Sequence, residues 1–284
     1  MKMSATRFYR PASSGTPQED RTAINLEKNI FVVCDGVSGP YSPSNPGIKY
    51  EGGLTGGQMV SKTICDAING PAVDLVEILR DANVKVLTNH LGVGKNPLKD
   101  AVAGASGVAC QIVDKKMKII TFGDAFALYK RKDFRFLTNF DQAAFNFEEN
   151  GNTAFETCLK DAGGDKGKAW DLYFDYFSKK QFFRANRNLG HGGHAALNGN
   201  PVFMECCTTA ILDLAGLDWV LLGSDGLLTA KSTDPKNVEV FAQELGKMYD
   251  DGGLPAILDW RDKEDNLPHI AGHPEASAIE LKFC

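Results

Sequence analysis

The alternation of apolar and polar residues along the chain predicts β-strands in its first part and in its middle. Residues 22–35 contain two apolar stretches separated by polar residues 27–29, which is the pattern of a hairpin. Further strand-like stretches cover residues 106–113, 116–125, 126–134, 218–224 and 277–283. The polar residues 114–116 predict a tight turn between two of these stretches. Because most neighbouring strands are joined by short turns, we expect antiparallel sheets.

Apolar residues three and four positions apart predict three helices, at residues 55–68, 73–91 and 235–253. Gly252 and Gly253 are typical of the end of the third helix. Residues 135–200 are polar, rich in glycine and partly helical, with the clearest helical pattern at residues 168–183. The order of these elements predicts an α/β (α+β) fold in which helices cover antiparallel sheets.

Three of the apolar strands end on an aspartate that has a glycine beside it. These are Asp35 after "NIFVVC", Asp124 after "IITFG" and Asp225 after "WVLLGS". A carboxylate at the end of a buried strand costs desolvation energy unless it is compensated. Two compensations are open: the aspartate bonds to backbone N–H groups of a turn, or several aspartates converge on a hard cation.

For any single aspartate the turn is favoured, but three such endings in one chain favour a shared cation. An adjacent glycine lets the backbone approach a ligand closely, so that a carbonyl oxygen joins the carboxylates. Oxygen ligands without a histidine indicate Mg²⁺ or Mn²⁺ rather than zinc. Asp35 and Asp225 are therefore the candidate catalytic residues, and all three aspartates are candidate metal ligands.

Composition excludes several classes of partner. The net charge is −5, with 43% hydrophobic and 24% charged residues, which gives no support for binding to nucleic acid or to a membrane surface. The seven cysteines are odd in number and show no C-x-x-C spacing, which is typical of free thiols in a reducing compartment. No stretch resembles a signal peptide or is long enough to span a bilayer. We expect a cytoplasmic, monomeric protein.

Several short motifs follow one another in the order found in a known family. They are "PQEDR" (17–21), "VVCDGVSG" (32–39), "GASGVACQIV" (104–113) with "ITFGDAFALY" (120–129), and "LLGSDGLL" (221–228). Together they resemble the motifs of the metal-dependent protein serine/threonine phosphatases of the protein phosphatase 2C type, the PPM family, in its bacterial form. The resemblance covers nearly the whole chain.

The resemblance implies a fold and a reaction. The fold is a four-layer αββα sandwich formed by residues 1–284 as one domain, with residues 135–200 as a flap beside the site. The reaction is hydrolysis of phosphoserine or phosphothreonine on a protein substrate by a hydroxide held between two metal ions. The cofactors are two or three Mn²⁺ or Mg²⁺ ions.

The resemblance also implies roles for individual residues. Asp35 bridges two metals, and the Gly36 carbonyl binds one of them. Asp225 binds the first metal, and Asp124 matches the ligand of a third metal in bacterial members. For the second metal, the acidic motif offers Glu19 or Asp20, directly or through water.

The chain departs from the family pattern at one position that would bind metal and at one that would bind phosphate. Glu275, followed by alanine, stands where the family has its last aspartate ligand, and its longer side chain moves the carboxylate. Gly15 stands where the family has a phosphate-binding arginine. The candidates to replace that arginine are Arg10, Arg21 and Lys49, and the sequence does not choose among them.

A third departure concerns the proton of the leaving group. Val37 replaces a histidine that serves some members as general acid, so the leaving alkoxide would take its proton from water. The departures keep an alternative function open: a catalytically weak, phosphatase-like binding or regulatory protein.

Overall fold

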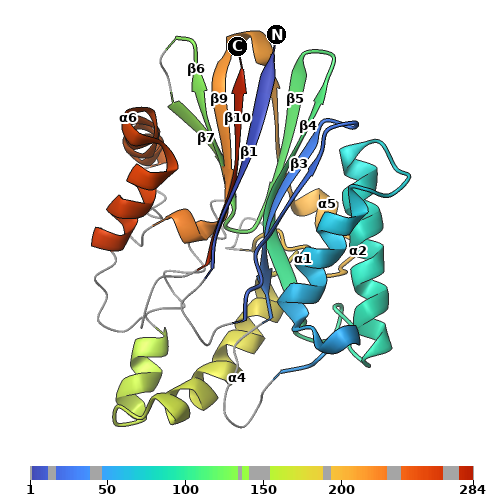
Figure 1. The fold of residues 1–284 in the computed structure, drawn as a ribbon. Helices are drawn as coiled ribbons and strands as arrows, with labels where there is room; N and C mark the ends of the chain where they lie inside the picture. Colours follow the sequence, from blue (N-terminus) through green and yellow to red (C-terminus); the bar gives the residue numbers. More distant parts are fainter. Residues whose placement is uncertain are drawn as a thin grey trace.

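Two five-stranded antiparallel sheets stand face to face in the computed structural model (Figure 1). The structure describes residues 2–11, 17–38, 47–133, 136–140, 154–187, 193–228, 238–264 and 275–283. The sheet with strand order β1-β10-β9-β6-β7 is called the β9 sheet, and the sheet with order β2-β3-β4-β5-β8 is called the β3 sheet.

The strand bounds of the β9 sheet are β1 Met3–Arg10, β6 Phe126–Arg131, β7 Phe136–Phe140, β9 Leu217–Gly223 and β10 Ala276–Phe283. Those of the β3 sheet are β2 Arg21–Asn25, β3 Ile30–Val37, β4 Gly104–Val113, β5 Lys116–Phe122 and β8 Thr208–Asp213. Short 3-10 turns lie at η1 Glu51–Gly53, η2 Leu214–Gly216 and η3 Asp225–Leu227. Helices α1 and α2 cover the outer face of the β3 sheet, and α6 covers that of the β9 sheet, so the predicted four-layer sandwich is confirmed (Figure 1).

The apolar runs in the central strands follow from this layering, because both faces of these strands are buried. In β3, the side chains of Phe31 and Val33 join the core between the two sheets. Those of Val32 and Cys34 point the other way, into the core beneath the helices. A side chain at position 35 therefore shares its face with Phe31 and Val33, towards the space between the sheets.

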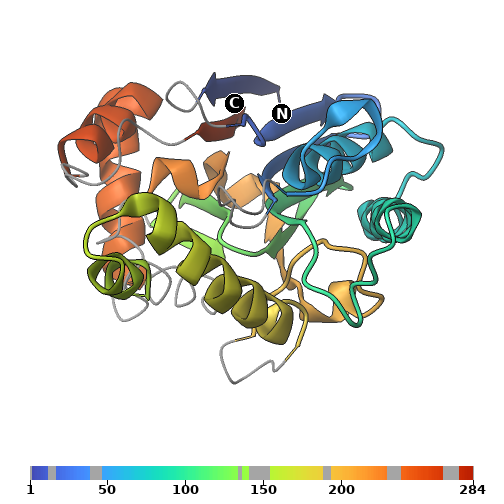
Figure 2. The same ribbon diagram turned by 90° about the horizontal axis from the view of Figure 1, so that it is seen from below.

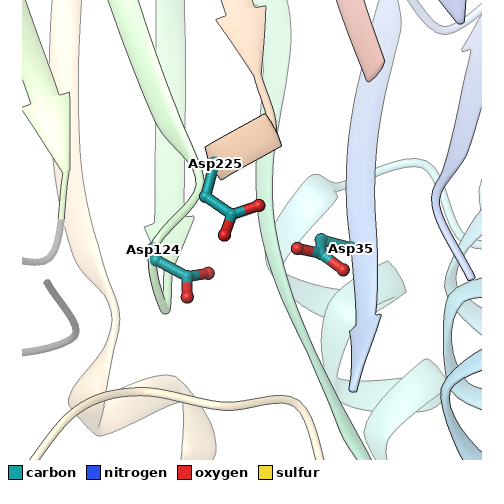
Figure 3. Close-up of side chains that lie close together, drawn as sticks. All are labelled: Asp35, Asp124 and Asp225. Atoms are coloured by element: carbon teal, nitrogen blue, oxygen red, sulfur yellow. The ribbon is translucent and has the colours of Figure 1, made fainter. Parts of the chain in front are cut away.

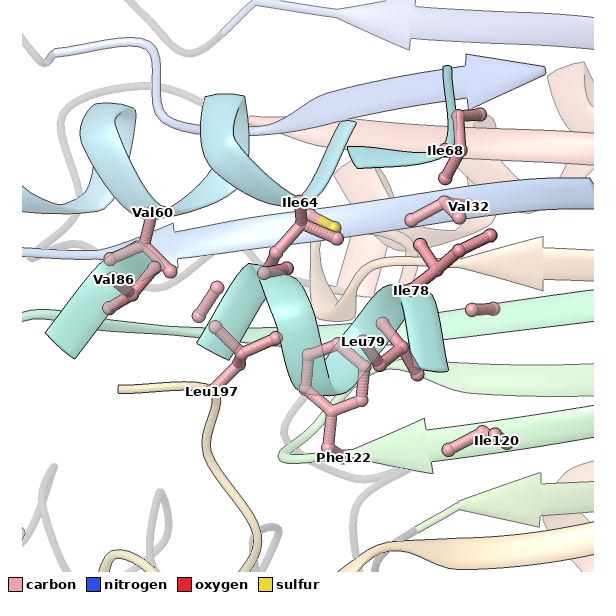
Figure 4. Packing of buried hydrophobic residues seen from close by; sticks show 14 of the residues in the cluster. Val32, Val60, Ile64, Ile68, Ile78, Leu79, Val86, Ile120, Phe122 and Leu197 are labelled. Carbon is pink, nitrogen blue, oxygen red and sulfur yellow. The ribbon is translucent and has the colours of Figure 1, made fainter. Parts of the chain in front are cut away.

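Helices α1 (Gly56–Ala67) and α2 (Leu75–Gly92) confirm the helices predicted at residues 55–68 and 73–91, and each begins within two residues of the predicted start. Thr55 forms a capping box with Gln58, and the Asp74 carboxylate accepts from the backbone N–H groups of Val76 and Glu77 in the first turn of α2. Figure 4 shows their packing on the β3 sheet, with Val32, Val60, Ile64, Leu79, Val86, Ile120 and Phe122 in the shared core. Burial of each large side chain there contributes about 1.5–3 kcal/mol.

Helix α6 (Val238–Glu264) extends beyond its predicted end at residue 253. The backbone does leave the helical conformation at Gly253, where φ is 66° and ψ is −161°. A second helical stretch then starts, with Pro255 in its first turn, where the missing N–H costs nothing. Ile257 of this second stretch is buried against the β9 sheet, which explains why the helix continues.

Three strands were not predicted: β1, β7 and β8. Each lies at the edge of a sheet. In β1 and β8 partly buried and exposed residues alternate, as expected for a strand with one covered face, and fully buried residues are lacking. Their sequences therefore lack the apolar runs that marked the central strands.

Helix α4 (Lys166–Arg184) and a helical stretch at residues 154–161 lie at the end of the sandwich opposite the two chain termini (Figures 1 and 2). Helix α4 confirms the helix predicted at residues 168–183, and a one-turn helix, α5 (Phe203–Cys206), follows it. Part of the segment 135–200 predicted as a flap, namely residues 135, 141–153 and 188–192, lies outside the described residues. In the described part of the chain, no helix is both long and apolar enough to cross a membrane.

Candidate metal centre

The three aspartates predicted from the strand endings meet at one end of the sandwich (Figure 3). Asp35 lies near the end of β3, Asp124 in the connection from β5 to β6, and Asp225 at the start of η3, just after β9. One carboxylate oxygen from each lies within 4.8 Å of the other two. All three side chains are partly buried. Residues that lie 89 to 190 positions apart in the sequence thus form a single group of oxygen ligands.

Strand pairing and one turn explain why the aspartates meet. Gly223 at the end of β9 pairs with Phe126 at the start of β6, which places Asp225 beside the β5–β6 connection. That connection crosses from the β3 sheet to the β9 sheet at Gly123, whose φ of +71° is strained for any other residue. A side chain there would also overlap Ser106, the residue that pairs with Asp35.

The electrostatics of this group favour a bound cation. Burial raises the pKa of Asp35 well above its usual range, and the neighbouring charges of Asp20, Asp225 and Asp124 raise it further. A divalent ion among these carboxylates would offset that repulsion. The donors are oxygen atoms alone, the set that Mg²⁺ and Mn²⁺ prefer. The residues present therefore fit the metal that the sequence predicts.

Asp20 belongs to the same charged region. Its side chain is buried and accepts a hydrogen bond from Ser224 Oγ at 2.8 Å. Burial, followed by the charges of Glu275 and Asp225, raises its pKa to about 7. The Ser224 hydroxyl in turn accepts from the backbone N–H of Ser277 at 2.9 Å, so Asp20 is tied to both β9 and β10.

This pKa shift leads to a prediction for the protein without metal. Asp20 binds its proton more tightly when the protein is folded than when it is unfolded, so its contribution favours folding at low pH and is lost as the pH rises through about 7. Asp20→Asn is expected to flatten the fall in unfolding free energy between about pH 4 and about pH 7, by up to ~1.4 kcal/mol per pH unit. Urea unfolding in EDTA measures this. The prediction would be contradicted if the unfolding free energies of wild type and variant fell equally steeply with pH.

The Glu19 carboxylate has several hydrogen-bond partners at the beginning of α1. Its carboxylate accepts from Thr55 Oγ1, from Ser38 Oγ and from the Ser38 backbone N–H. The chain is tightly packed here, because a Cβ on Gly36 would lie 2.4 Å from the carbonyl oxygen of Gly57. The Glu19 carboxylate thus contacts Thr55, the N-cap residue of α1, and Ser38, and its role as a metal ligand stays a prediction.

Glu275 lies just before β10 and also has hydrogen-bond partners. Its Oε1 atom accepts from the Tyr9 hydroxyl at 2.7 Å, and its Oε2 atom accepts from the Glu19 backbone N–H at 2.7 Å. The three-aspartate group does not include it. Sequence reasoning missed Tyr9 and Ser224 as members of this site, and no local pattern in the sequence marks either residue.

The three candidates for phosphate binding have different surroundings. Arg10 Nη1 donates to both carboxylate oxygens of Asp262 in α6, each at 3.0 Å. Arg21 lies at the start of β2, where it pairs with Cys34. Lys49 is exposed to solvent. Arg10 is thus engaged by α6, and the choice among the three stays open.

Comparison with known proteins shows which fold this is. No family model matches the sequence, and no characterised protein matches it significantly in sequence. Among solved structures, serine/threonine phosphatase Stp1 from Staphylococcus aureus matches with a TM-score of 0.55 and 14% identity, over 100% of this chain and 96% of that one. PppA, a regulatory component of the type VI secretion system (T6SS) in Pseudomonas aeruginosa, matches with a TM-score of 0.55 and 14% identity, over 99% and 98% of the two chains.

A third solved structure is that of the catalytic domain of the serine/threonine protein phosphatase PstP in complex with two manganese ions. It matches with a TM-score of 0.51 and 14% identity, over 99% of this chain and 97% of that one. The chain therefore has the fold of the bacterial serine/threonine phosphatases, which confirms the fold that the motifs imply.

Proposed function

We propose that the protein is a PPM-type phosphatase that hydrolyses phosphoserine and phosphothreonine on protein substrates with the help of Mn²⁺ or Mg²⁺. The observation that carries the proposal is the convergence of oxygen atoms of Asp35, Asp124 and Asp225 within 4.8 Å of one another. The fold shared with bacterial serine/threonine phosphatases supports it, as does the presence of two manganese ions in the PstP structure.

In this proposal Asp35, Asp124 and Asp225 hold the metal ions, with the Gly36 carbonyl and Asp20 beside them. When bound, the ions lower the pKa of water and stabilise the negative charge that develops on the phosphoryl group. The chain's own contribution is orientation: Asp35 and Asp225 end strands of different sheets and point towards one another (Figure 3). Val37 carries no titratable group, so that position supplies no proton to the leaving alkoxide.

The segment 135–200 is proposed as the flap of a single domain formed by residues 1–284. Its helix α4 lies at the same end of the sandwich as the three aspartates (Figures 1 and 2). Loop-rich segments beside a site often carry its binding residues, so this segment would govern substrate choice.

The test is release of phosphate from a phosphoserine peptide in the presence of Mn²⁺. We expect activity that is lost in EDTA and restored by added Mn²⁺. Asp35→Ala is expected to lower the rate at least about a hundredfold, because it removes a carboxylate that would hold the metal ions, and the ions stabilise the negative charge of the transition state. Turnover that survives both EDTA and this substitution would show that the chemistry lies elsewhere.

A second candidate is a phosphatase-like binding protein with little turnover. The observation in its favour is that both carboxylate oxygens of Glu275, at the position of the family's last ligand, are engaged by Tyr9 and Glu19. Calorimetric titration with Mn²⁺ separates the two candidates. The phosphatase binds Mn²⁺ and hydrolyses the peptide, whereas the binding protein binds Mn²⁺ feebly and releases no phosphate.

A further inference from the structure

Glu275 forms a hydrogen-bonded bridge between three segments that are distant in sequence. Its two carboxylate oxygens accept from the Tyr9 hydroxyl on β1 and from the Glu19 backbone N–H, each at 2.7 Å. The Tyr9 hydroxyl also lies 3.1 Å from Gln18 Oε1, its second partner. The start of β10, the outer strand β1 and the segment 17–20 are therefore joined at one carboxylate.

The residue that this bridge places is Asp20. Asp20 follows Glu19 directly, is 7% exposed, and accepts from Ser224 Oγ at 2.8 Å on its other side. Ser224 is the neighbour of Asp225 in the chain. The Glu19 N–H contact and the Ser224 contact thus fix Asp20 from two directions, next to a proposed metal ligand.

The backbone of Glu275 is itself fixed against the metal-binding turn. A Cβ on Gly226, the residue after Asp225, would lie 1.7 Å from the Glu275 carbonyl oxygen. Glu275 therefore cannot shift towards η3 without a backbone collision. Its longer side chain reaches outward to Tyr9 and Glu19 instead.

We propose that Glu275 is a positioning residue that holds Asp20 beside Asp225 through Tyr9 and the Glu19 N–H, and that it does not itself bind the metal. The inference rests on the proposed function, because it assigns the metal to the aspartates. The three-aspartate group does not include Glu275, and each of its carboxylate oxygens already accepts a hydrogen bond that holds the side chain in place. Partners that orient ligands in this way typically change metal affinity by about 10–100-fold when they are removed.

The first experiment is Tyr9→Phe, with Mn²⁺ binding measured by isothermal titration calorimetry. The Tyr9 side chain is 45% exposed, so loss of the hydroxyl leaves its packing largely unchanged. We expect Mn²⁺ to bind about tenfold more weakly. Tyr176→Phe, on the exposed surface of α4, is the matched control and should bind as wild type does. If Tyr9→Phe bound Mn²⁺ as tightly as wild type or more tightly, the proposal would be overturned. Glu275 would then be a metal ligand that loss of the Tyr9 hydrogen bond leaves free to bind the ion.

Two further variants test whether the effect passes through Asp20. In an Asp20→Asn background, Tyr9→Phe should cause no additional loss of Mn²⁺ affinity, because the group being positioned is already altered. Glu275→Gln should weaken binding no more than Tyr9→Phe does, since an amide oxygen still accepts from the Glu19 N–H. The positioning role would be overturned if Tyr9→Phe and Asp20→Asn had additive effects on Mn²⁺ affinity. It would also be overturned if Glu275→Gln lowered that affinity by more than about a hundredfold.

Amide hydrogen exchange in the metal-free protein tests the bridge separately from the metal. We expect the Glu19 amide to be protected in wild type and to exchange at least about tenfold faster in Glu275→Ala, because its acceptor is gone. Equal exchange in the two proteins would overturn the inference. Failure of wild type to bind Mn²⁺ would instead overturn the proposed function, and the two failures are thereby distinguished.

Discussion

Asp35→Asn is expected to raise the melting temperature of the metal-free protein and to abolish the further rise that Mn²⁺ causes in wild type. Burial and the neighbouring carboxylates of Asp20, Asp225 and Asp124 all disfavour the charge on Asp35, as its raised pKa shows. A neutral amide of the same shape removes this repulsion. A gain of ~1 kcal/mol corresponds to about 2–4 °C in a chain of this size.

The loss of the metal response is the larger effect. At a Mn²⁺ concentration of about 100 times Kd, binding stabilises the folded state by ~2.7 kcal/mol, and the variant should lose this contribution. Differential scanning calorimetry with EDTA or with Mn²⁺ measures both effects. Asp251→Asn, at an exposed position in α6, is the control and should change neither. A lower melting temperature in EDTA, together with an intact Mn²⁺ response, would contradict the assignment of Asp35 to the metal centre.

Gly226→Ala is expected to lower the unfolding free energy by about 3–5 kcal/mol, among the largest effects of a single substitution. The added Cβ would lie 1.7 Å from the carbonyl oxygen of Glu275, 2.8 Å from its carbonyl carbon and 2.9 Å from the Cα atom of Ala276. All three are backbone atoms, so no side-chain rotation relieves the collision. Either η3 or the start of β10 must move.

Gly92→Ala, at the end of α2, is the matched control for this substitution. A Cβ at Gly92 meets nothing within 4 Å, so the substitution should be neutral or stabilise by about 0.4–1 kcal/mol. Urea unfolding of the three proteins gives the comparison. Equal stability of Gly226→Ala and wild type would mean that η3 and β10 do not pack as closely as described.

The parts of the fold that the sequence predicts are those whose residues are buried on both sides. Strands β3, β4, β5 and β9 carry long apolar runs because both of their faces are buried. Helices cover the outer face of each sheet, and the two inner faces pack against each other. Strands β1 and β8 escape prediction because one face of each is open and their apolar residues are scattered. The break at Gly253 is visible in the sequence, but the second stretch of α6 forms because residues such as Ile257 find a buried place on the β9 sheet.

The same division holds for the metal centre. Asp35, Asp124 and Asp225 are predictable because each ends an apolar strand, which is a local pattern. The partners that orient the site are not, because the Tyr9–Glu275 and Ser224–Asp20 contacts join residues 266 and 204 positions apart. Such contacts depend on the way the strands are arranged in the sheets, and no spacing along the chain indicates them.

The three aspartates come from both halves of the sandwich. The interface between the sheets, packed with residues such as Val108 and Val220, therefore sets the separation of Asp35 from Asp225. An ion bound at this junction acts as a cross-link that opposes sliding of one sheet over the other. Substitutions deep in that interface should consequently change the Mn²⁺ affinity even where they leave the overall fold unchanged.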